Sequence, residues 1–339
     1  MSKGKISLII LAVFAVIAVF CVTIHLLQKK PVQSLTAVKP VQTGSKKDSV
    51  ESAVAPAAKQ TDSINLTISA FQKKPSLATL NVVENSIRQQ LPSLSIEQRY
   101  ALLEQWEKAL TPMISRLDPE QKKVLTIYDN LAGSSYVDSE SAADYGKRMD
   151  RELPEKLTFY QKTLYKQLTD HQIQITQAEE VGSVYKLKPA YWKDLFASSL
   201  TESDQKYWNQ RAFENDPVVD YDAGLAVDRV TLGDWAFSWE QYLKKYPKSH
   251  YQNHAESIYQ SYMCDLLVGL ENTPTLDSET NKIVPEVETD FDTIIKRHPN
   301  SSVSNAITLF RKKIQEVEGK TNISTKLYDI ANTIVKQTK

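Results

Sequence analysis

The stretch "YLKKYPKS", residues 242–249, returns in altered form as "IIKRHPNS", residues 294–301. When Pro247 is placed on Pro299, the basic pair before each proline coincides, and a serine follows each proline after one residue. Apolar positions on both sides fall on apolar positions: Trp239 on Phe291, Leu243 on Ile295, Tyr251 on Val303, Ile258 on Phe310 and Tyr262 on Ile314. The chain therefore contains an internal repeat with a period of 52 residues.

Each copy predicts two helices joined by a short turn. A basic pair suits the C-terminal end of a helix, and the proline that follows cannot continue it. Ser249 and Ser301 are placed to cap the second helix of each copy, and Gln252 would complete a capping box in the first. Gly269 and Gly319 are expected to end the two second helices.

This pattern resembles the tetratricopeptide-like helical repeats of bacterial envelope proteins. The first copy matches their turn motif with Tyr246, Pro247, Ser249, Tyr251 and Ala255. The second departs from it with His298, Val303 and Ile307. The resemblance covers about 80 of the 339 residues, and the period exceeds the usual ~34 of such repeats. It implies stacked helix pairs and implies no activity.

The predicted fold class is all-α, with tetratricopeptide-like helix pairs and one small β-hairpin. Only 9 glycines occur, and apolar residues recur at spacings of three and four. Helix starts are indicated by Ser95 with Gln98, by Asp118, and by Thr201 with Asp204.

The hairpin is predicted in "HQIQITQAEEVGSVYKLKP". Ile173 and Ile175 alternate with polar residues, as do Tyr185 and Leu187, and Gly182 lies between the two runs. We expect this hairpin to separate two helical regions of the chain.

Residues 6–27 predict a membrane anchor. They carry no Asp, Glu, Lys or Arg, and as a helix they would extend ~33 Å, enough for a hydrocarbon core of about 30 Å. A cleaved signal peptide is the alternative, but no small-x-small site follows Leu27. Lipidation at Cys21 is disfavoured because the bulky Phe20 precedes it.

The anchor divides the chain into a membrane segment, a tether and an exported part. Lysines flank the apolar run on both sides, so positive-inside counting is near balance, and we expect the short N-terminus inside. Ser, Ala, Pro, Lys and Gln dominate the following segment, which contains no aromatic residue and is expected to be flexible. The predicted divisions are an anchor, a linker, an N-terminal helical region, and a hairpin with the helical repeats: 1–30, 31–64, 65–170 and 171–339.

Charge and cysteine content limit the classes of function. The 41 basic and 41 acidic residues balance, so the sequence shows no electrostatic footprint for nucleic acid. The two cysteines, Cys21 and Cys264, are not expected to pair, so the fold must be held by packing. The low cysteine content is compatible with either side of a bacterial membrane.

No residue is assigned a catalytic, cofactor-binding or metal-binding role. His250 and His254 have a spacing that suits a metal, but no third ligand follows, and turn or surface roles are favoured. An aspartate-rich stretch misses the calcium-loop template, so capping and turn roles are favoured there also. Its acids are Asp216, Asp220, Asp222, Asp228 and Asp234.

Aromatic residues are dense between Tyr185 and Tyr262. Most are expected in the core, and some are candidates for a groove that binds a partner, because Trp and Tyr combine apolar area with a polar atom. The candidate groove residues are Trp192, Trp208, Trp235, Tyr246 and Tyr251.

The sequence thus favours a non-enzymatic, single-pass, membrane-tethered helical-repeat protein that binds a protein or peptide outside the cytoplasm, with no cofactor. Two alternatives stay open: a module that binds an envelope glycan or small molecule in the region 185–262, and an enzyme that uses Asp220 and Asp222.

Overall fold

The computed structural model describes residues 54–134, 142–178, 182–214, 220–221, 224–317 and 326–338. Residues Ser52–Lys339 cluster as one compact unit. The predicted membrane anchor at 6–27 lies outside the described residues. Among the helices that are described, none combines the length and the hydropathy that crossing a membrane requires.

The predicted linker becomes helical before its expected end. The first described helix, α2, runs over Val54–Lys73 and so begins inside the segment 31–64. Its alanine-rich start favours a helix, and Ile64, Ile68 and Phe71 are buried along one face. The burial of this face explains why the chain orders here despite its polar composition.

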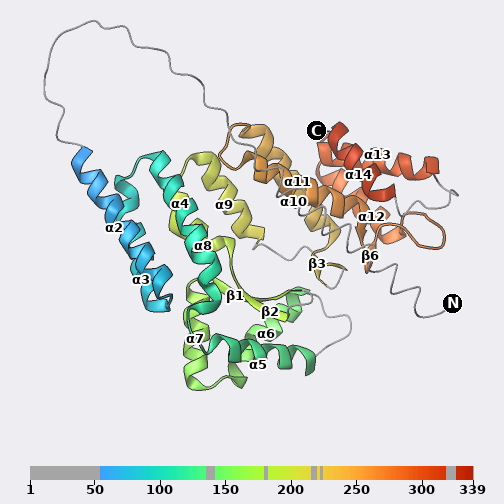
Figure 1. Ribbon diagram of the computed structural model, residues 1–339. Helices are drawn as coiled ribbons and strands as arrows, with labels where there is room; N and C mark the ends of the chain where they lie inside the picture. The colour runs from blue at the N-terminus through green and yellow to red at the C-terminus, as the bar shows by residue number, and fades with distance from the viewer. Residues whose placement is uncertain are drawn as a thin grey trace, which may run out of the picture. The chain divides into compact units, whose positions relative to one another are not determined.

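Helices form the first part of the described chain (Figure 1). The predicted cap at Ser95 is confirmed: its side chain accepts the N–H of Gln98, whose side chain returns a bond to the Ser95 backbone. Asp118 likewise accepts the N–H of Glu120 just before the next helix. The elements are α3 (Leu77–Gln90), η1 (Leu91–Ser93), α4 (Ile96–Leu110), η2 (Thr111–Arg116), α5 (Gln121–Ser134), α6 (Ala142–Lys156) and α7 (Phe159–Asp170).

The predicted β-hairpin is confirmed. Strands β1 (Ile173–Ala178) and β2 (Gly182–Leu187) pair antiparallel, with Ile173 opposite Leu187 and Ile175 opposite Tyr185. The hairpin packs on η2, α5 and α7. Two further strand pairs are not predicted by the sequence pattern, because each strand has two residues: β3 (Asp220–Tyr221) with β4 (Gly224–Leu225), and β5 (Gly269–Leu270) with β6 (Thr273–Pro274).

Helix α9 (Glu202–Glu214) joins the first helices to the repeat. It follows α8 (Pro189–Phe196) and η3 (Ala197–Ser199), and it starts after Thr201 as predicted. At its beginning, the Tyr100 hydroxyl of α4 donates to the Asp204 carboxylate. At its end, the buried Glu214 carboxylate accepts bonds from Trp239 Nε1 at 2.7 Å and the Tyr262 hydroxyl at 2.8 Å. Both ends of α9 are therefore fixed by buried acids.

The two predicted helix pairs are confirmed. The first consists of α10 (Arg229–Lys245) and α11 (Gln252–Val268), and the second of α12 (Pro285–Arg297) and α13 (Ser302–Val317). The joints repeat in backbone geometry: Tyr246 has φ −125° and ψ 59°, and His298 has φ −125° and ψ 57°. A further helix, α14 (Leu327–Thr338), packs on α11 and α13 (Figure 1).

The predicted serine cap of the second helix is present in the second copy of the repeat and absent from the first. The Ser301 hydroxyl accepts the N–H of Ser304 at 3.0 Å. Helix α11 instead begins at Gln252 after Tyr251 and has no side-chain cap, so the predicted role of Ser249 and the capping box are wrong. Relative to the repeat, α11 starts two positions later than α13. This shift leaves Ser249 too far from the start of α11 to cap it.

Contacts between the pairs set their stacking. The buried Glu240 carboxylate of α10 accepts the N–H groups of Ser302 at 3.0 Å and Val303 at 3.1 Å, where α13 begins. An anion at a helix N-terminus is stabilising because unsatisfied N–H groups gather there. Gly233 lets α10 approach α12 closely, since a Cβ at this position would lie 2.7 Å from Ile294 Cδ1.

Candidate functional site

A folded insertion separates the two helix pairs. Residues 269–284 form β5, β6 and an isolated antiparallel bridge between Leu276 and Ile283. The Thr275 N–H donates to the Val268 carbonyl at 3.1 Å, and the Val284 N–H donates to the Thr275 carbonyl at 3.0 Å. This insertion accounts for a period of 52 residues where a bare helix pair needs ~34.

Gly269 fixes the start of the insertion. It ends α11 as predicted, with φ 72°, a conformation that favours glycine. A Cβ at this position would overlap the Thr273 carbonyl oxygen and lie 2.5 Å from a terminal nitrogen of Arg229. The strand pair therefore depends on the absence of a side chain here. The predicted end at Gly319 lies outside the described residues.

Arg229 stabilises the same turn through two hydrogen bonds. Its buried guanidinium donates to the Leu266 carbonyl at 2.8 Å and to the Thr273 carbonyl at 2.6 Å. Burial lowers the pKa of the Arg229 guanidinium to about 10, with nearby Asp290 opposing the shift. The group is thus still charged at neutral pH, and it ties the end of α11 to β6.

The tip of the insertion is a tight turn organised by Asp277. Its carboxylate accepts the N–H of Glu279 at 3.1 Å and both the N–H and the hydroxyl of Thr280 at 2.8 Å. The bonds from Thr280, foremost its backbone N–H, lower the pKa of Asp277. Asn281 then adopts φ 56°, a left-handed conformation that asparagine tolerates better than most residues. Local bonds thus fix the turn.

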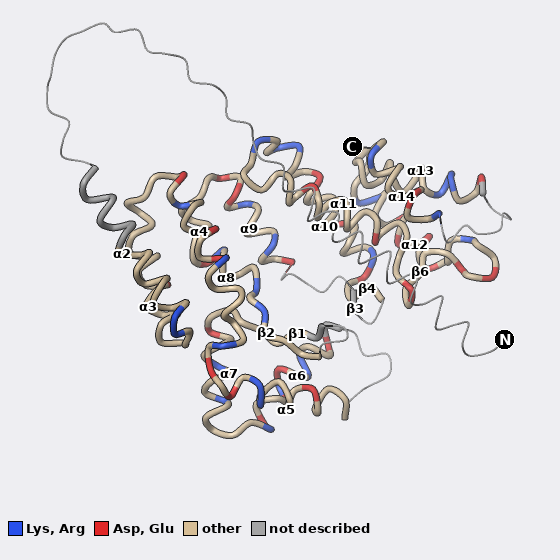
Figure 2. The backbone as a smooth tube through the Cα atoms, viewed as in Figure 1, with Lys and Arg blue, Asp and Glu red and all other residues tan. Residues whose placement is uncertain are grey.

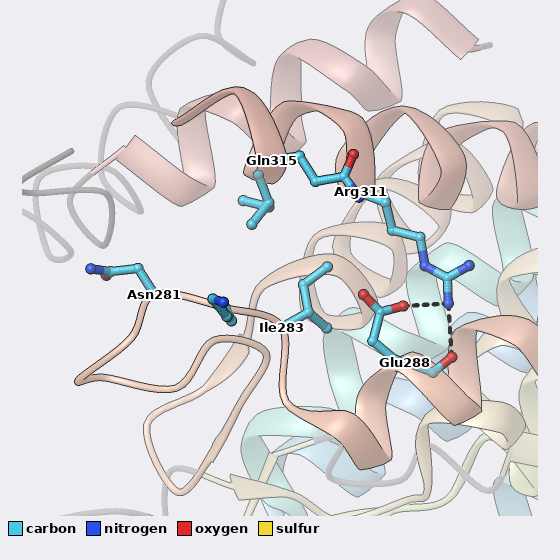
Figure 3. A pocket seen from close by; sticks show the side chains of 7 residues that line it. Asn281, Ile283, Glu288, Arg311 and Gln315 are labelled. Carbon is cyan, nitrogen blue, oxygen red and sulfur yellow. Dashed lines mark hydrogen bonds and ion pairs between the residues drawn. The ribbon is translucent and has the colours of Figure 1, made fainter. Parts of the chain in front are cut away.

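A cleft of about 230 Å³ lies between this turn and α13 (Figure 3). Ile314, which is buried, and the half-buried Ile283 supply its apolar floor. Figure 3 shows Asn281 on the turn and Gln315 on the helix, on either side of the floor. The residues that line the cleft are Asn281, Lys282, Ile283, Glu288, Arg311, Ile314 and Gln315.

An ion-pair network closes one end of the cleft. One terminal nitrogen of Arg311 lies 2.5 Å from the Glu288 carboxylate and 2.8 Å from the Glu288 carbonyl oxygen. The other lies 2.8 Å from Asp292, and the guanidinium carbon sits 5.6 Å from the centre of the Phe291 ring. The Arg311 Nε is buried and has no acceptor among the described residues. These contacts hold α13 at a fixed distance from α12.

The shape and chemistry of the cleft suit a small part of a larger ligand. Sites that enclose whole small molecules usually measure about 300–1,000 Å³, so this cleft is small for a cofactor. Its floor is apolar, and its rim offers two amides, which each donate and accept hydrogen bonds. Most of the surface that the cleft exposes is polar, because Ile314 at its floor is only 3% exposed.

Nothing matches this chain in comparisons with protein families, with curated proteins or with solved structures.

The five candidate groove residues come from α8, α9, α10 and the joint between α10 and α11. Trp192, Trp208 and Trp235 are buried, with 6%, 8% and 9% of their surface exposed. The first two pack against each other with ring centres 6.4 Å apart, whereas Trp235 contacts Tyr262 at 6.0 Å. In this structure the three indoles serve core packing.

Tyr246 and Tyr251 are partly buried. Tyr251 stacks on Tyr207 with ring centres 4.3 Å apart and meets Trp208 edge to face. The Tyr246 hydroxyl donates to Glu202 at 2.8 Å, which fastens the joint of the first pair to the start of α9. The structure thus brings four of the five candidates to one junction. A partner-binding role for them stays a prediction.

The two histidines of the first joint point to different neighbours. His250 stacks on Tyr100, with ring centres 4.3 Å apart, and its Nε2 lies 3.5 Å from Glu104. His254 Nδ1 is bonded to the Tyr207 hydroxyl at 2.6 Å. Within the described residues, no group of three potential ligands gathers to hold a metal.

The aspartate-rich stretch is only partly described. Asp228 caps α10 by accepting the N–H of Thr231 at 2.8 Å, as favoured from the sequence. Asp234 bonds to Arg297 and His298, each at 2.6 Å. The side chains of Asp216, Asp220 and Asp222 lie outside the described residues.

Sequence reasoning missed the cleft. Its residues come from a turn and from two helices of the second pair, and no sequence motif marks them together as a site. The available signal was the long repeat period together with "DSETN", residues 277–281, in which an acid precedes a threonine by three positions.

Proposed function

We propose that this chain is a non-enzymatic, membrane-tethered helical-repeat protein that binds a protein or peptide partner outside the cytoplasm. The observation that carries the proposal is the cleft between the inserted turn and α13, because it is rigidly built and too small for an independent cofactor. Stacked helix pairs present extended surfaces of the kind that bind polypeptides. The likeness to tetratricopeptide-like repeats of the bacterial envelope is part of this proposal.

The membrane attachment rests on the sequence. Residues 6–27 are mostly apolar and carry no Asp, Glu, Lys or Arg, and the polar segment after them can place the helical region away from the bilayer. Such an arrangement suits an adaptor that meets a second protein at or near the membrane surface.

The distribution of charge agrees with a polypeptide partner better than with a polyanion. Figure 2 shows basic and acidic residues interspersed along the described helices. The chain as a whole is neutral, with 41 residues of each sign. A nucleic-acid partner would call for a basic stripe, which the described helices do not display.

In-cell crosslinking tests the proposal. The tagged full chain is crosslinked in cells that make it naturally, extracted from membranes and purified, and the captured proteins are quantified by mass spectrometry. We expect one reproducible partner in near-stoichiometric amount. The control is residues 1–64 fused to an unrelated soluble protein, which should not capture it. An empty result at good coverage, or equal capture by the control, would contradict the adaptor function.

A further inference from the structure

We infer that the exposed side of α12 binds a second copy of this chain, which stacks on it through its α2–α3 joint, residues 73–78. The contact repeats, between two chains, the one that joins the two helix pairs within a chain. The inference goes beyond the proposed function, because the occupant is the chain itself rather than a different protein.

Acids on α10 fasten the joint of the second helix pair. Asp234 bonds to Arg297 and His298 at that joint, each at 2.6 Å. Glu240, on the same helix, accepts the N–H groups of the first two residues of α13. One helix of a pair thus binds the cations of the next joint with one acid and the helix N-terminus behind it with another.

The first joint is fastened in a related way. Glu202, at the start of α9, accepts the Tyr246 hydroxyl at 2.8 Å and lies 3.8 Å from the ammonium group of Lys245. An acid on an earlier helix and a cation at the joint therefore recur where successive helices stack.

Helix α12 carries acids at both places that α10 uses. With the repeat aligned, Asp234 falls on Glu286 and Glu240 falls on Asp292. Glu286 is exposed and bonds to no described residue, and the Asp292 side chain is 74% exposed. This side of α12 therefore stays open among the described residues, although it has the charges of an occupied one.

The ion pair that Asp292 makes with Arg311, at 2.8 Å, is compatible with this role. Glu240 bonds to Lys244 at 2.5 Å and still accepts both N–H groups of α13. Lys296, the counterpart of Lys244, is likewise one turn beyond Asp292. A carboxylate has about four acceptor positions, so a neighbouring cation does not use them up.

The surface of α12 beside these acids is small and uncharged. The Thr289 hydroxyl donates to the Pro285 carbonyl at 3.0 Å, and the Thr293 hydroxyl donates to the Thr289 carbonyl at 2.9 Å. Both hydroxyls are thus satisfied within the helix. Covering them leaves no polar group without a partner, which keeps the cost of burial low.

The α2–α3 joint has the chemistry that this side of α12 requires. It reads "KKPS" at 73–76, with a basic pair, a proline and a serine in the same order as "KRHPNS" at 296–301. Ser76 caps α3 through a backbone N–H, as Ser301 caps α13. Both lysines are exposed, and neither forms an ion pair with a described residue.

Helix α3 also offers its N-terminus. Leu77 and Ala78 are its first two residues, and N–H groups at these positions have no acceptor within their own helix. They correspond to the two groups that Glu240 accepts in α13. Asp292 of a neighbouring copy is the equivalent acceptor.

Two large apolar side chains lie exposed on the same helix pair. Leu66 on α2 is 72% exposed, and Val82 on α3 is 53% exposed. Among the described helices none precedes α2, so this pair has no earlier pair to stack on. A neighbouring chain that covers it removes apolar surface from water.

The α2–α3 joint is favoured over the two later joints because acids of the same chain already bind those. The contact is head-to-tail, since it joins two different surfaces of the chain. Such contacts produce rings or filaments rather than closed two-fold dimers.

Analytical ultracentrifugation of the purified full chain, in detergent of matched density, tests the inference. We expect the protein mass to rise with concentration above that of one chain. The double variant Lys73→Glu/Lys74→Glu and the single variant Glu286→Lys should each weaken association by about tenfold, because like charges then face each other. Lys122→Glu is the matched control on an exposed lysine of α5 and should associate as the wild type does.

Combining the three substitutions in one chain should restore association, because the charges are reversed on both surfaces. A mass of one chain at every concentration would overturn the inference. Association that neither charge-reversed surface weakens would do so as well, since the contact would then lie elsewhere.

Crosslinking keeps the test decisive if Glu286→Lys fails to fold. A chain with Lys74→Cys is mixed with a differently tagged chain with Glu286→Cys, both with Cys21 and Cys264 replaced by serine, and a short bis-maleimide is added. We expect a product that contains both tags. An equal yield when Lys122→Cys replaces Lys74→Cys would overturn the assigned surfaces.

Discussion

At the scale of single residues, two serines in the same place of the repeat differ in their hydrogen bonds. Ser301 caps α13, whereas α11 has no side-chain cap and the neighbour of Ser249 is the Tyr242 hydroxyl. Removing a serine cap costs about 1 kcal/mol. We expect Ser301→Ala to lower the free energy of unfolding by that amount and Ser249→Ala to change it less, as urea denaturation would show. Equal losses would contradict the assigned cap.

Glu214 makes stability depend on pH. Burial raises the pKa of this carboxyl above its ordinary 4.5, although bonds from Gln210, Tyr262 and Trp239 and the charge of Arg211 act against the shift. A group with a raised pKa in the folded state contributes stability that is fully present below the unfolded-state pKa. That contribution is lost as the pH rises through the folded-state pKa. Acidification therefore favours the folded state at this site.

We accordingly expect the wild type to gain stability relative to Glu214→Gln as the pH falls from neutral toward 4.5. The measurement is the difference in free energy of unfolding between the two proteins at several pH values. Glu97→Gln provides a control of opposite sign, because the backbone N–H bond at Glu97 and the Ser95 hydroxyl lower the pKa of that carboxyl. A Glu214 difference that does not vary with pH would contradict the role of burial.

At the scale of elements, the insertion depends on Arg229. Arg229→Met would leave the carbonyls of Leu266 and Thr273 without their donor, at a cost of about 3 kcal/mol. We expect faster hydrogen exchange at the amides of 269–284 than in the wild type. Arg229→Lys should fall between the two, because one ammonium cannot reproduce both bonds of the planar guanidinium. Unchanged hydrogen exchange in Arg229→Met would show that the insertion keeps its structure without the hydrogen bonds of Arg229.

The packing of α10 on α12 depends on Gly233. A methyl group there would lie 2.7 Å from Ile294 Cδ1, so we expect Gly233→Ala to destabilise the chain by about 1–3 kcal/mol. Gly146 in α6 is the matched site, because a Cβ there meets nothing within 4 Å. Gly146→Ala should stabilise its helix by up to about 1 kcal/mol. Thermal melting of both variants tests the two predictions. Melting temperatures that change in the same direction in the two variants would contradict them.

At the scale of the whole molecule, membrane attachment is predicted to depend on residues 6–27 alone. We expect the full chain to stay in the membrane fraction through alkaline carbonate extraction, and a chain without these residues to be released. An antibody against the C-terminal part follows both. Release of the full chain would contradict the anchor, and retention of the shortened one would point to a second attachment.

The sequence by itself determined the helical class, the hairpin and the repeated helix pair. Each of these depends on local rules that act over a few residues: the alternation around Ile175 and Tyr185, the Ser95 box, and the proline that ends α10 and α12. The near-identical backbone angles at Tyr246 and His298 show that the same local sequence yields the same joint.

Only the tertiary structure decided the cap of α11, the burial of the tryptophans and the cleft. The start of α11 shifts where Tyr251 stacks on Tyr207, a residue more than forty positions away in the chain. The indoles of Trp192, Trp208 and Trp235 are equally apolar in a core or a groove, so composition cannot distinguish the two. The cleft requires that a turn, α12 and α13 meet, and such long-range packing leaves no periodic trace in the sequence.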